Sequence, residues 1–209
     1  MTSRLISFEG IDGSGKSTQI NLLSEWLSEK NIDFVIVREP GGTSISERIR
    51  DILLDEQYLQ LCTASESFLF LSARAQLVSE IIKPALQGGR FVICDRFIDS
   101  TLAYQGYGRG MDLAQLEAMN NMAIGGCVLG QTFLLDVDIE NSIQRRSGSE
   151  DDRMESAGVD FMRKVRDGYI QLSTKFSNRI TLLDSTEDKN SIFNKITEQM
   201  CSIYGELND

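Results

Sequence analysis

Five short apolar segments alternate along the chain with longer segments of helical periodicity. Nearly every position in the short segments is hydrophobic, which is typical of strands buried on both faces of a sheet. These segments cover residues 5–10, 33–39, 90–95, 132–137 and 180–184. The segments of helical periodicity cover residues 17–30, 44–54, 65–87, 113–123, 139–146, 159–176 and 189–204. The regular alternation predicts an α/β fold in which helices flank a five-stranded parallel sheet.

No feature of the sequence marks a boundary between domains. The chain has 209 residues, of which 41% are hydrophobic, and this length suits one domain with one core. The two prolines are isolated, and there is no internal repeat or low-complexity linker. We therefore expect residues 1–209 to form a single domain, interrupted only by a polar surface segment at residues 145–158.

Composition narrows the classes of function. A formal net charge of −10 repels nucleic acids and anionic membranes on average, and no apolar run reaches the roughly 18 residues of a membrane span. The four cysteines are far apart and lack metal-ligand spacing, so we expect reduced thiols in a cytoplasmic protein. Histidine is absent, so any chemistry must proceed without an imidazole base.

The segment GIDGSGKS, residues 10–17, matches the phosphate-binding pattern GxxxxGK[S/T]. It follows an apolar strand and opens a helix, which is the context that this motif requires. Backbone N–H groups and the helix N-terminus surround the phosphates, Lys16 reaches the β- and γ-phosphates, and the Ser17 hydroxyl ligates Mg²⁺. A nucleoside triphosphate and Mg²⁺ are implied. The predicted binding loop consists of Gly10, Ile11, Asp12, Gly13, Ser14, Gly15, Lys16, Ser17 and Thr18.

Residues with possible functional roles, most of them charged, lie where the predicted strands end. The strand ends carry Gly10, Arg38, Glu39, Asp95, Arg96, Asp136 and Asp138. Ligands of open parallel sheets bind beyond the carboxyl ends of the strands, so we expect these groups to converge on one cleft. Asp95 occupies the position that orients Mg²⁺ in phosphate-loop proteins, although it could instead cap the end of its strand. Arg38 and Arg96 suit a second phosphate because a guanidinium can hold two oxygens, although each could instead pair with a neighbouring carboxylate.

Seven motifs follow one another along the chain. They are GIDGSGKST (10–18), REPGGT (38–43), LFLSARAQ (69–76), IKPAL (82–86), DRF (95–97), STLAYQGYGRG (100–110) and DDRMES (151–156). Together they resemble the bacterial thymidylate kinases nearly end to end. The resemblance implies a P-loop nucleoside monophosphate kinase fold with a short lid. It also implies an Mg²⁺-assisted transfer of the γ-phosphoryl group of ATP to dTMP, giving dTDP for dTTP synthesis, in a homodimer.

The same resemblance suggests how dTMP is recognised. Phe70 and Arg74 are four residues apart on a predicted helix and share one face. By resemblance, Phe70 stacks on thymine and Arg74 donates to the thymine O4, an acceptor that cytosine replaces with a donor. Helix packing for Phe70 and solvation for Arg74 remain the alternative. The other expected dTMP contacts are Asp12, Arg38, Pro40, Arg96, Ser100, Thr101, Tyr104 and Gln105.

Within this group the resemblance gives individual roles. Asp12 is expected on the 3′-hydroxyl of the acceptor sugar, and Ser100 and Thr101 on the thymine N3 edge. Tyr104 is expected to crowd a ribose 2′-hydroxyl and so to favour deoxynucleotides. Ordinary loop packing is the alternative for Ser100, Thr101, Tyr104 and Gln105.

Arginines in the polar segment are expected to replace a charge that the loop lacks. Some thymidylate kinases carry an arginine inside the phosphate loop where this chain has Gly13. We expect residues 145–158 to form a lid whose Arg145, Arg146 and Arg153 act in catalysis with Lys16 and Arg96. The phosphate of dTMP is already anionic at neutral pH, so no general base is needed. A solvated loop with internal ion pairs is the alternative.

Two other functions remain open at this stage. The chain could phosphorylate a different nucleoside or nucleoside monophosphate, or it could be a regulatory module that binds ATP without turnover. A GTPase is not expected, because the guanine-reading motif NKxD is missing after the fourth predicted strand. The adenine site is poorly marked, and residues 185–188 are our prediction from their place after the last strand.

Overall fold

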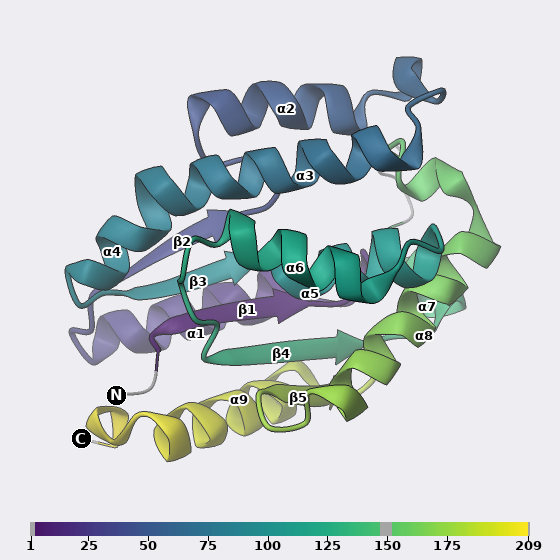
Figure 1. The fold of residues 1–209 in the computed structure, drawn as a ribbon. Helices are drawn as coiled ribbons and strands as arrows, with labels where there is room; N and C mark the ends of the chain where they lie inside the picture. Colours follow the sequence, from purple (N-terminus) through teal and green to yellow (C-terminus); the bar gives the residue numbers. More distant parts are fainter. Residues whose placement is uncertain (1–2, 147–151, 209) are drawn as a thin grey trace.

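The fold is built on one parallel β-sheet, seen in a computed structural model that describes residues 3–146 and 152–208. Its strands are β1 (Leu5–Glu9), β2 (Phe34–Arg38), β3 (Phe91–Asp95), β4 (Gln131–Asp136) and β5 (Ile180–Asp184). They lie in the order β2-β3-β1-β4-β5, and every neighbouring pair is parallel. The arrows of β1, β2, β3 and β4 accordingly point the same way in Figure 1. The predicted α/β fold and five-stranded parallel sheet are confirmed.

Helices cover both faces of the sheet (Figure 1). The α-helices are α1 (Lys16–Glu29), α2 (Ser44–Leu54), α3 (Thr63–Leu77), α4 (Lys83–Gln87), α5 (Ile98–Thr101), α6 (Leu113–Ala123), α7 (Ile139–Arg145), α8 (Val159–Lys175) and α9 (Lys189–Ile203). The π-helical segments are η2 (Val78–Ile82) and η3 (Leu102–Gly108), and the 3₁₀ turns are η1 (Glu56–Tyr58), η4 (Glu155–Ala157) and η5 (Gly205–Leu207).

Alternate residues of the central strands β1, β3 and β4 enter hydrophobic clusters on opposite faces of the sheet. In β3, Phe91 and Ile93 pack with side chains of α1 and α9, whereas Val92 and Cys94 pack with side chains of α3, η2 and α4. All four are fully buried. Burial on both faces removes the need for a polar face, which explains why the strands are almost continuously apolar.

The helix predicted over residues 65–87 contains a π-helical segment. Its α-helical parts, α3 and α4, are separated by η2, which ends two residues before Pro84. Proline lacks an N–H donor and its ring displaces the carbonyl four residues earlier, so the regular hydrogen-bond pattern cannot continue through this position. The helix therefore persists in direction but changes its hydrogen bonding.

Residues 98–108 form the short helix α5 followed by η3, although no helix was predicted there. Two glycines hide the helical pattern in the sequence. A Cβ on Gly106 would collide with the side chain of Leu113, and one on Gly108 would lie 2.6 Å from the ring of Phe161. Close packing against α6 and α8 requires glycine here despite its low helix propensity.

Strand register brings three motifs together at the carboxyl edge of the sheet. Asp95 at the end of β3 pairs with Phe8 of β1 on one side and with Arg38 of β2 on the other. The phosphate loop, REPGGT and DRF therefore leave neighbouring strands at one edge. Within the described part of the chain, no helix combines the length and apolar character needed to cross a membrane.

Candidate active site

The phosphate loop connects β1 to α1 and is closed by glycines in the left-handed region. Gly15 has φ +92° and caps the N-terminus of α1. Gly13 has φ +76°, and a Cβ there would lie 2.7 Å from the carbonyl oxygen of Ser142 in α7. The loop is therefore packed against α7 at Gly13, the position where some thymidylate kinases carry an arginine. A side chain at residue 13 does not fit this arrangement.

Lys16 is buried inside the loop, with an exposure of 6%. Its Nζ donates to the carbonyl oxygens of Gly10 (3.0 Å) and Ile11 (3.1 Å) and lies 3.6 Å from Asp12 Oδ1. Burial lowers the pKa of this ammonium group, and the nearby charge of Arg96 lowers it further. The ammonium is thus held by the loop itself and faces a cavity in front of it.

That cavity has a volume of about 610 Å³ and lies over the phosphate loop. Its walls contain loop residues 12–18 together with Arg38, Asp95, Arg96 and Arg145. Ser185 and Glu187, from the predicted adenine-contacting segment, also line it. We call this space the loop cavity. Every residue of the predicted triphosphate site lines it except Gly10 and Ile11, whose carbonyls hold Lys16.

A second cavity of about 280 Å³ lies beside the first, between α3, the α5–η3 segment and residues 152–155. We call it the acceptor cavity. The predicted dTMP contacts that line it are Asp12, Pro40, Phe70, Arg74, Arg96, Ser100, Thr101, Tyr104 and Gln105. Arg38 lines only the loop cavity and pairs through its NH2 with Glu47 of α2 at 2.9 Å. The structure therefore brings nearly all of the predicted acceptor residues together.

The two cavities share the side chains of Asp12, Glu39, Arg50 and Arg96. Arg96 has a backbone φ of +70°, which is rare for a residue other than glycine. This backbone conformation directs its guanidinium into the junction between the cavities. Its NH2 donates to Asp12 Oδ1 at 2.7 Å and its NH1 to the carbonyl of Gly10 at 2.9 Å. Burial alone would raise the pKa of Asp12, but Arg96 and Lys16 outweigh this and lower it. The junction therefore holds a charged pair between two ligand spaces.

Asp95 fits the ligand set of a magnesium ion. Its Oδ1 is buried and has no hydrogen-bond partner among the described residues, and it lines the loop cavity with the exposed Ser17. Across residues 3–146 and 152–208, no cluster of three or more histidine, cysteine or carboxylate side chains could hold a metal. Mg²⁺ bound to nucleotide phosphates needs only one or two protein ligands, so a single carboxylate and a hydroxyl suffice.

Arg74 is 2% exposed and forms the floor of the acceptor cavity. Its guanidinium makes four hydrogen bonds and an ion pair within the protein. Nε and NH2 bind Glu39 Oε2, at 2.8 Å and 2.6 Å, and NH2 also donates to the carbonyl of Phe97. NH1 donates to the hydroxyl of Thr101 at 2.7 Å and to Asn120 Oδ1 at 2.5 Å. The expected donation to thymine O4 therefore requires one of these bonds to be exchanged.

The three lid arginines lie in different environments. Arg145 lines the loop cavity and donates to the carbonyls of Gly13 (3.3 Å) and Ser185 (2.7 Å). Arg146 lies 2.6 Å from Glu155 Oε1, and its charge contributes to the lowered pKa of Asp12. Arg153 lines neither cavity, in contrast to the expected lid role, because its guanidinium is buried elsewhere. Residues 147–151 of the predicted lid lie outside the described residues.

Comparison with known proteins identifies the family of the chain. The family model described as thymidylate kinase matches residues 8–196. The chain belongs to the thymidylate kinase family. A thymidylate kinase of Pelotomaculum thermopropionicum is 47% identical over 188 residues, covering 89% of this chain and 87% of that protein. A thymidylate kinase of Kosmotoga olearia is 41% identical over 195 residues, covering 93% of each.

Solved structures agree with this assignment. The thymidylate kinase of Ehrlichia chaffeensis superimposes with a TM-score of 0.76 and 37% identity, covering 94% of this chain and 97% of that chain. The fold is thus the P-loop nucleoside monophosphate kinase fold. Thymidylate kinases phosphorylate dTMP to dTDP with ATP, and the chain is an enzyme of this class.

Two residues in or beside the candidate site were not predicted from the sequence. Arg50 of α2 lines both cavities and donates to the carbonyl of Pro40 at 2.8 Å. Glu9 is fully buried at the end of β1, where its Oε2 accepts from the hydroxyls of Ser100 (2.6 Å) and Tyr169 (2.9 Å). Only Glu9 gave a signal, as a carboxylate at the end of an apolar strand directly before the phosphate loop.

Proposed function

We propose that ATP occupies the loop cavity, that dTMP occupies the acceptor cavity, and that their phosphates meet at the junction. The observation that carries this proposal is the sharing of Asp12, Glu39, Arg50 and Arg96 by the two cavities. Two phosphate-bearing ligands in adjoining spaces face each other across these side chains. Positioning of this kind, together with charge stabilisation, is the main requirement of phosphoryl transfer.

On the ATP side, Lys16 and the N-terminus of α1 bind the phosphates. The bonds from Lys16 Nζ to two loop carbonyls give it a fixed position from which it can turn to the β- and γ-phosphates. Ser185 and Glu187, within residues 185–188, contact the adenosine part, which is consistent with their place in the wall of the loop cavity.

On the dTMP side, Arg96 and Arg50 hold the acceptor phosphate at the junction, with Arg38 approaching from the loop cavity. Asp12 stays ionised beside Arg96 and accepts from the 3′-hydroxyl of the deoxyribose. The acceptor phosphate is already anionic, so the arginines supply what the reaction lacks, which is positive charge around the transferred group. This division of labour explains how an enzyme without histidine performs the transfer.

Thymine lies in the inner part of the acceptor cavity, against the ring of Phe70. Arg74 contacts the thymine O4, and the bond exchanged for it is the one to the hydroxyl of Thr101, because Thr101 also lines the cavity and can then contact the base. Pro40 borders the space for the thymine methyl group. Ser100, Tyr104 and Gln105 form the opposite wall.

Ser17 and Asp95 hold Mg²⁺ in this proposal. The fit rests on the buried and unpartnered Oδ1 of Asp95 and on the exposed hydroxyl of Ser17 in the same cavity. Ser17 and Asp95 would hold Mg²⁺ in the loop cavity, where it would supply positive charge beside the phosphates of ATP. Arg145 and Arg146 add positive charge beside the phosphate loop. From the segment predicted as a lid, Arg145 borders the loop cavity and residues 152, 154 and 155 border the acceptor cavity, within a single proposed domain of residues 1–209.

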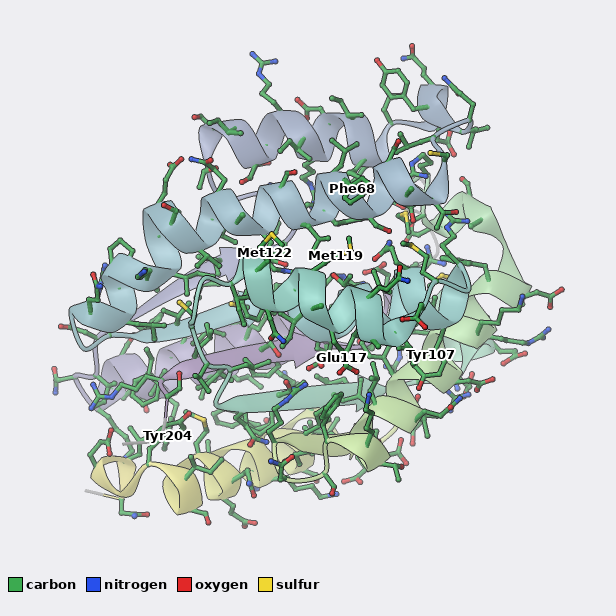
Figure 2. The ribbon with its side chains drawn as sticks, in the orientation of Figure 1. Phe68, Tyr107, Glu117, Met119, Met122 and Tyr204 are labelled. Atoms are coloured by element: carbon green, nitrogen blue, oxygen red, sulfur yellow. The ribbon has the colours of Figure 1, made fainter. Side chains whose placement is uncertain are left out.

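The proposed assembly is a homodimer that pairs through α3 and α6. Phe68 on α3 and Met122 on α6 are 59% and 82% exposed, which is unusual for large apolar side chains. Figure 2 shows both of them together with Met119 on the same side of the molecule. A second copy of the chain would cover this face. Because ATP and dTMP are intracellular metabolites, we also propose a cytoplasmic location.

A substrate panel tests the proposal. ADP release is measured with dTMP, dUMP, dCMP, dAMP and thymidine, with and without Mg²⁺, and with Lys16→Met as the inactive control. We expect dTMP to be the best substrate and dUMP, which lacks one methyl group, to be about 10- to 200-fold poorer in kcat/KM. Thymidine lacks the acceptor phosphate and should give no product. Equal rates with dCMP and dTMP, or no dTDP at all, would contradict the proposal.

A further inference from the structure

Arg153 is almost completely buried, although it belongs to a polar segment of the chain. Its exposure is 4%, and its NH1 lies 2.7 Å from Oε2 of Glu66, which is itself 1% exposed. Glu66 belongs to the first turn of α3 and also accepts from Gln105 Nε2 at 3.0 Å and from Arg109 NH2 at 3.1 Å. A charge buried this deeply is stable only when it is paired, so Glu66 fixes the position of Arg153.

Arg153 also binds the end of α2. Its Nε donates to the carbonyl of Leu53 at 2.6 Å, and its backbone N–H donates to the carbonyl of Leu54 at 3.1 Å. These are the last two residues of α2, where helical carbonyls have no partner within the helix. One side chain therefore joins residues 152–155 to both α2 and α3.

The residues on either side of Arg153 face the acceptor cavity. Asp152, Met154 and Glu155 line it, and Met154 belongs to the same hydrophobic cluster as Tyr104, with Phe70 packed against that cluster. The turn is rigid, because Asp152 Oδ1 accepts from the backbone N–H groups of Met154 (2.8 Å) and Glu155 (3.0 Å). A rigid turn anchored at its centre presents its flanking side chains to the cavity as a fixed wall.

We infer that Arg153 is a positioning residue for dTMP binding, and that its ion pair with Glu66 holds residues 152–155 as the outer wall of the acceptor cavity. The inference rests on the proposed occupancy of that cavity by dTMP. It assigns Arg153 no contact with the transferred phosphoryl group, because its donors are directed to Glu66, Leu53 and Met154. Without the ion pair between Arg153 and Glu66, residues 152–155 occupy their position at the cavity in only a fraction of the molecules. The apparent affinity for dTMP is reduced in proportion to that fraction.

The test compares Arg153→Met with two matched variants, Arg145→Met at the loop cavity and Arg163→Met on the exposed face of α8. The dTMP dissociation constant is measured by calorimetry without ATP, and kcat and both KM values by ADP release. For Arg153→Met we expect the dTMP dissociation constant and KM to rise about tenfold, with kcat and the ATP KM within about twofold of wild type. Arg163→Met should match wild type, and Arg145→Met should alter kcat or the ATP KM.

Two results would overturn the inference. One is a fall in kcat of Arg153→Met by about 100-fold or more at unchanged dTMP affinity, which would make it a phosphate-neutralising residue. The other is wild-type behaviour in every assay. If Arg153→Met does not fold, Met154→Ala removes the wall side chain and keeps the bonds of Arg153 to Glu66 and Leu53, and it must weaken dTMP binding selectively. Wild-type protein that binds no dTMP would instead contradict the proposed function, so the two failures are distinguishable.

Discussion

Glu9 gives the most quantitative prediction about this fold. The carboxyl group is fully buried at the end of β1, where Oε1 accepts from the backbone N–H of Phe97 at 2.7 Å. Burial raises the pKa of Glu9 from its usual 4.5 to about 7, and repulsion from Asp99 adds to the rise, whereas its hydrogen bonds and Arg96 oppose it. The folded protein therefore binds this proton more tightly than the unfolded chain does.

The sign and size of the effect follow from proton linkage. Between pH 4.5 and about 7 the unfolded chain loses the Glu9 proton before the folded protein does, so rising pH favours unfolding. With a Glu9 pKa of 4.5 in the unfolded chain and about 7 in the folded protein, the free energy of unfolding falls by about 2.5 kcal/mol between pH 5 and pH 8. Glu9→Gln cannot titrate and escapes this loss, while its amide can still bond Phe97 and the two hydroxyls.

Urea unfolding at several pH values measures the difference. The single tryptophan, Trp26, packs against the hydrophobic core and reports unfolding by fluorescence. From pH 5 to pH 8, we expect the free energy of unfolding of Glu9→Gln to rise by about 2.5 kcal/mol relative to that of wild type, with little further change at higher pH. Glu198→Gln, at an exposed position of α9, is the control for a general charge effect. A difference between Glu9→Gln and wild type that is constant across this pH range would refute the reasoning.

Three further predictions concern the active site and the assembly. Asp95→Asn should lower kcat about 100-fold and raise the Mg²⁺ concentration for half-maximal rate, as measured by titrating Mg²⁺ at saturating substrates. Phe70→Ala should raise the dTMP KM about 10- to 100-fold through lost stacking, with the ATP KM unchanged in steady-state kinetics. Met122→Glu should convert the proposed dimer to a monomer in sedimentation velocity experiments, because a charge on the α3–α6 face opposes the burial of that face. An unchanged Mg²⁺ requirement, an equal rise of both KM values, or a persistent dimer would contradict these expectations in turn.

The sequence was most informative where capping residues and hydrophobic periodicity coincide. The bounds predicted for α2 and α6 agree with the structure, and each helix begins after a side chain that caps it. The hydroxyl of Thr43 accepts from the N–H of Ser46 at 3.1 Å, and Asp112 Oδ1 accepts from that of Gln115 at 2.8 Å. Such signals are local, so they can be interpreted without knowledge of the fold.

Contacts between residues far apart in the chain could not be predicted from the sequence. Glu9 and Tyr169 are separated by 160 residues, and their hydrogen bond depends on the packing of α8 against β4 and the α5–η3 segment. Arg50 follows REPGGT on an ordinary amphipathic helix, and only the strand order places it at the junction of the cavities. The role of a residue in a motif can be predicted from the sequence. A partner that comes from another helix or strand can be identified only in the tertiary structure.

The lid arginines show why proximity in sequence does not decide the role of a charge. Arg145 and Arg153 are only eight residues apart, and both were expected to neutralise the transferred phosphate. In the fold, Arg145 lines the loop cavity, while Arg153 meets a carboxylate, Glu66, that comes from a helix far earlier in the chain. Burial favours that pairing, because an arginine that moved from Glu66 to a phosphate would leave the buried carboxylate with only Arg109 and Gln105 as partners. The position of one acidic side chain in α3 therefore separates an arginine available for catalysis from one that shapes the acceptor cavity.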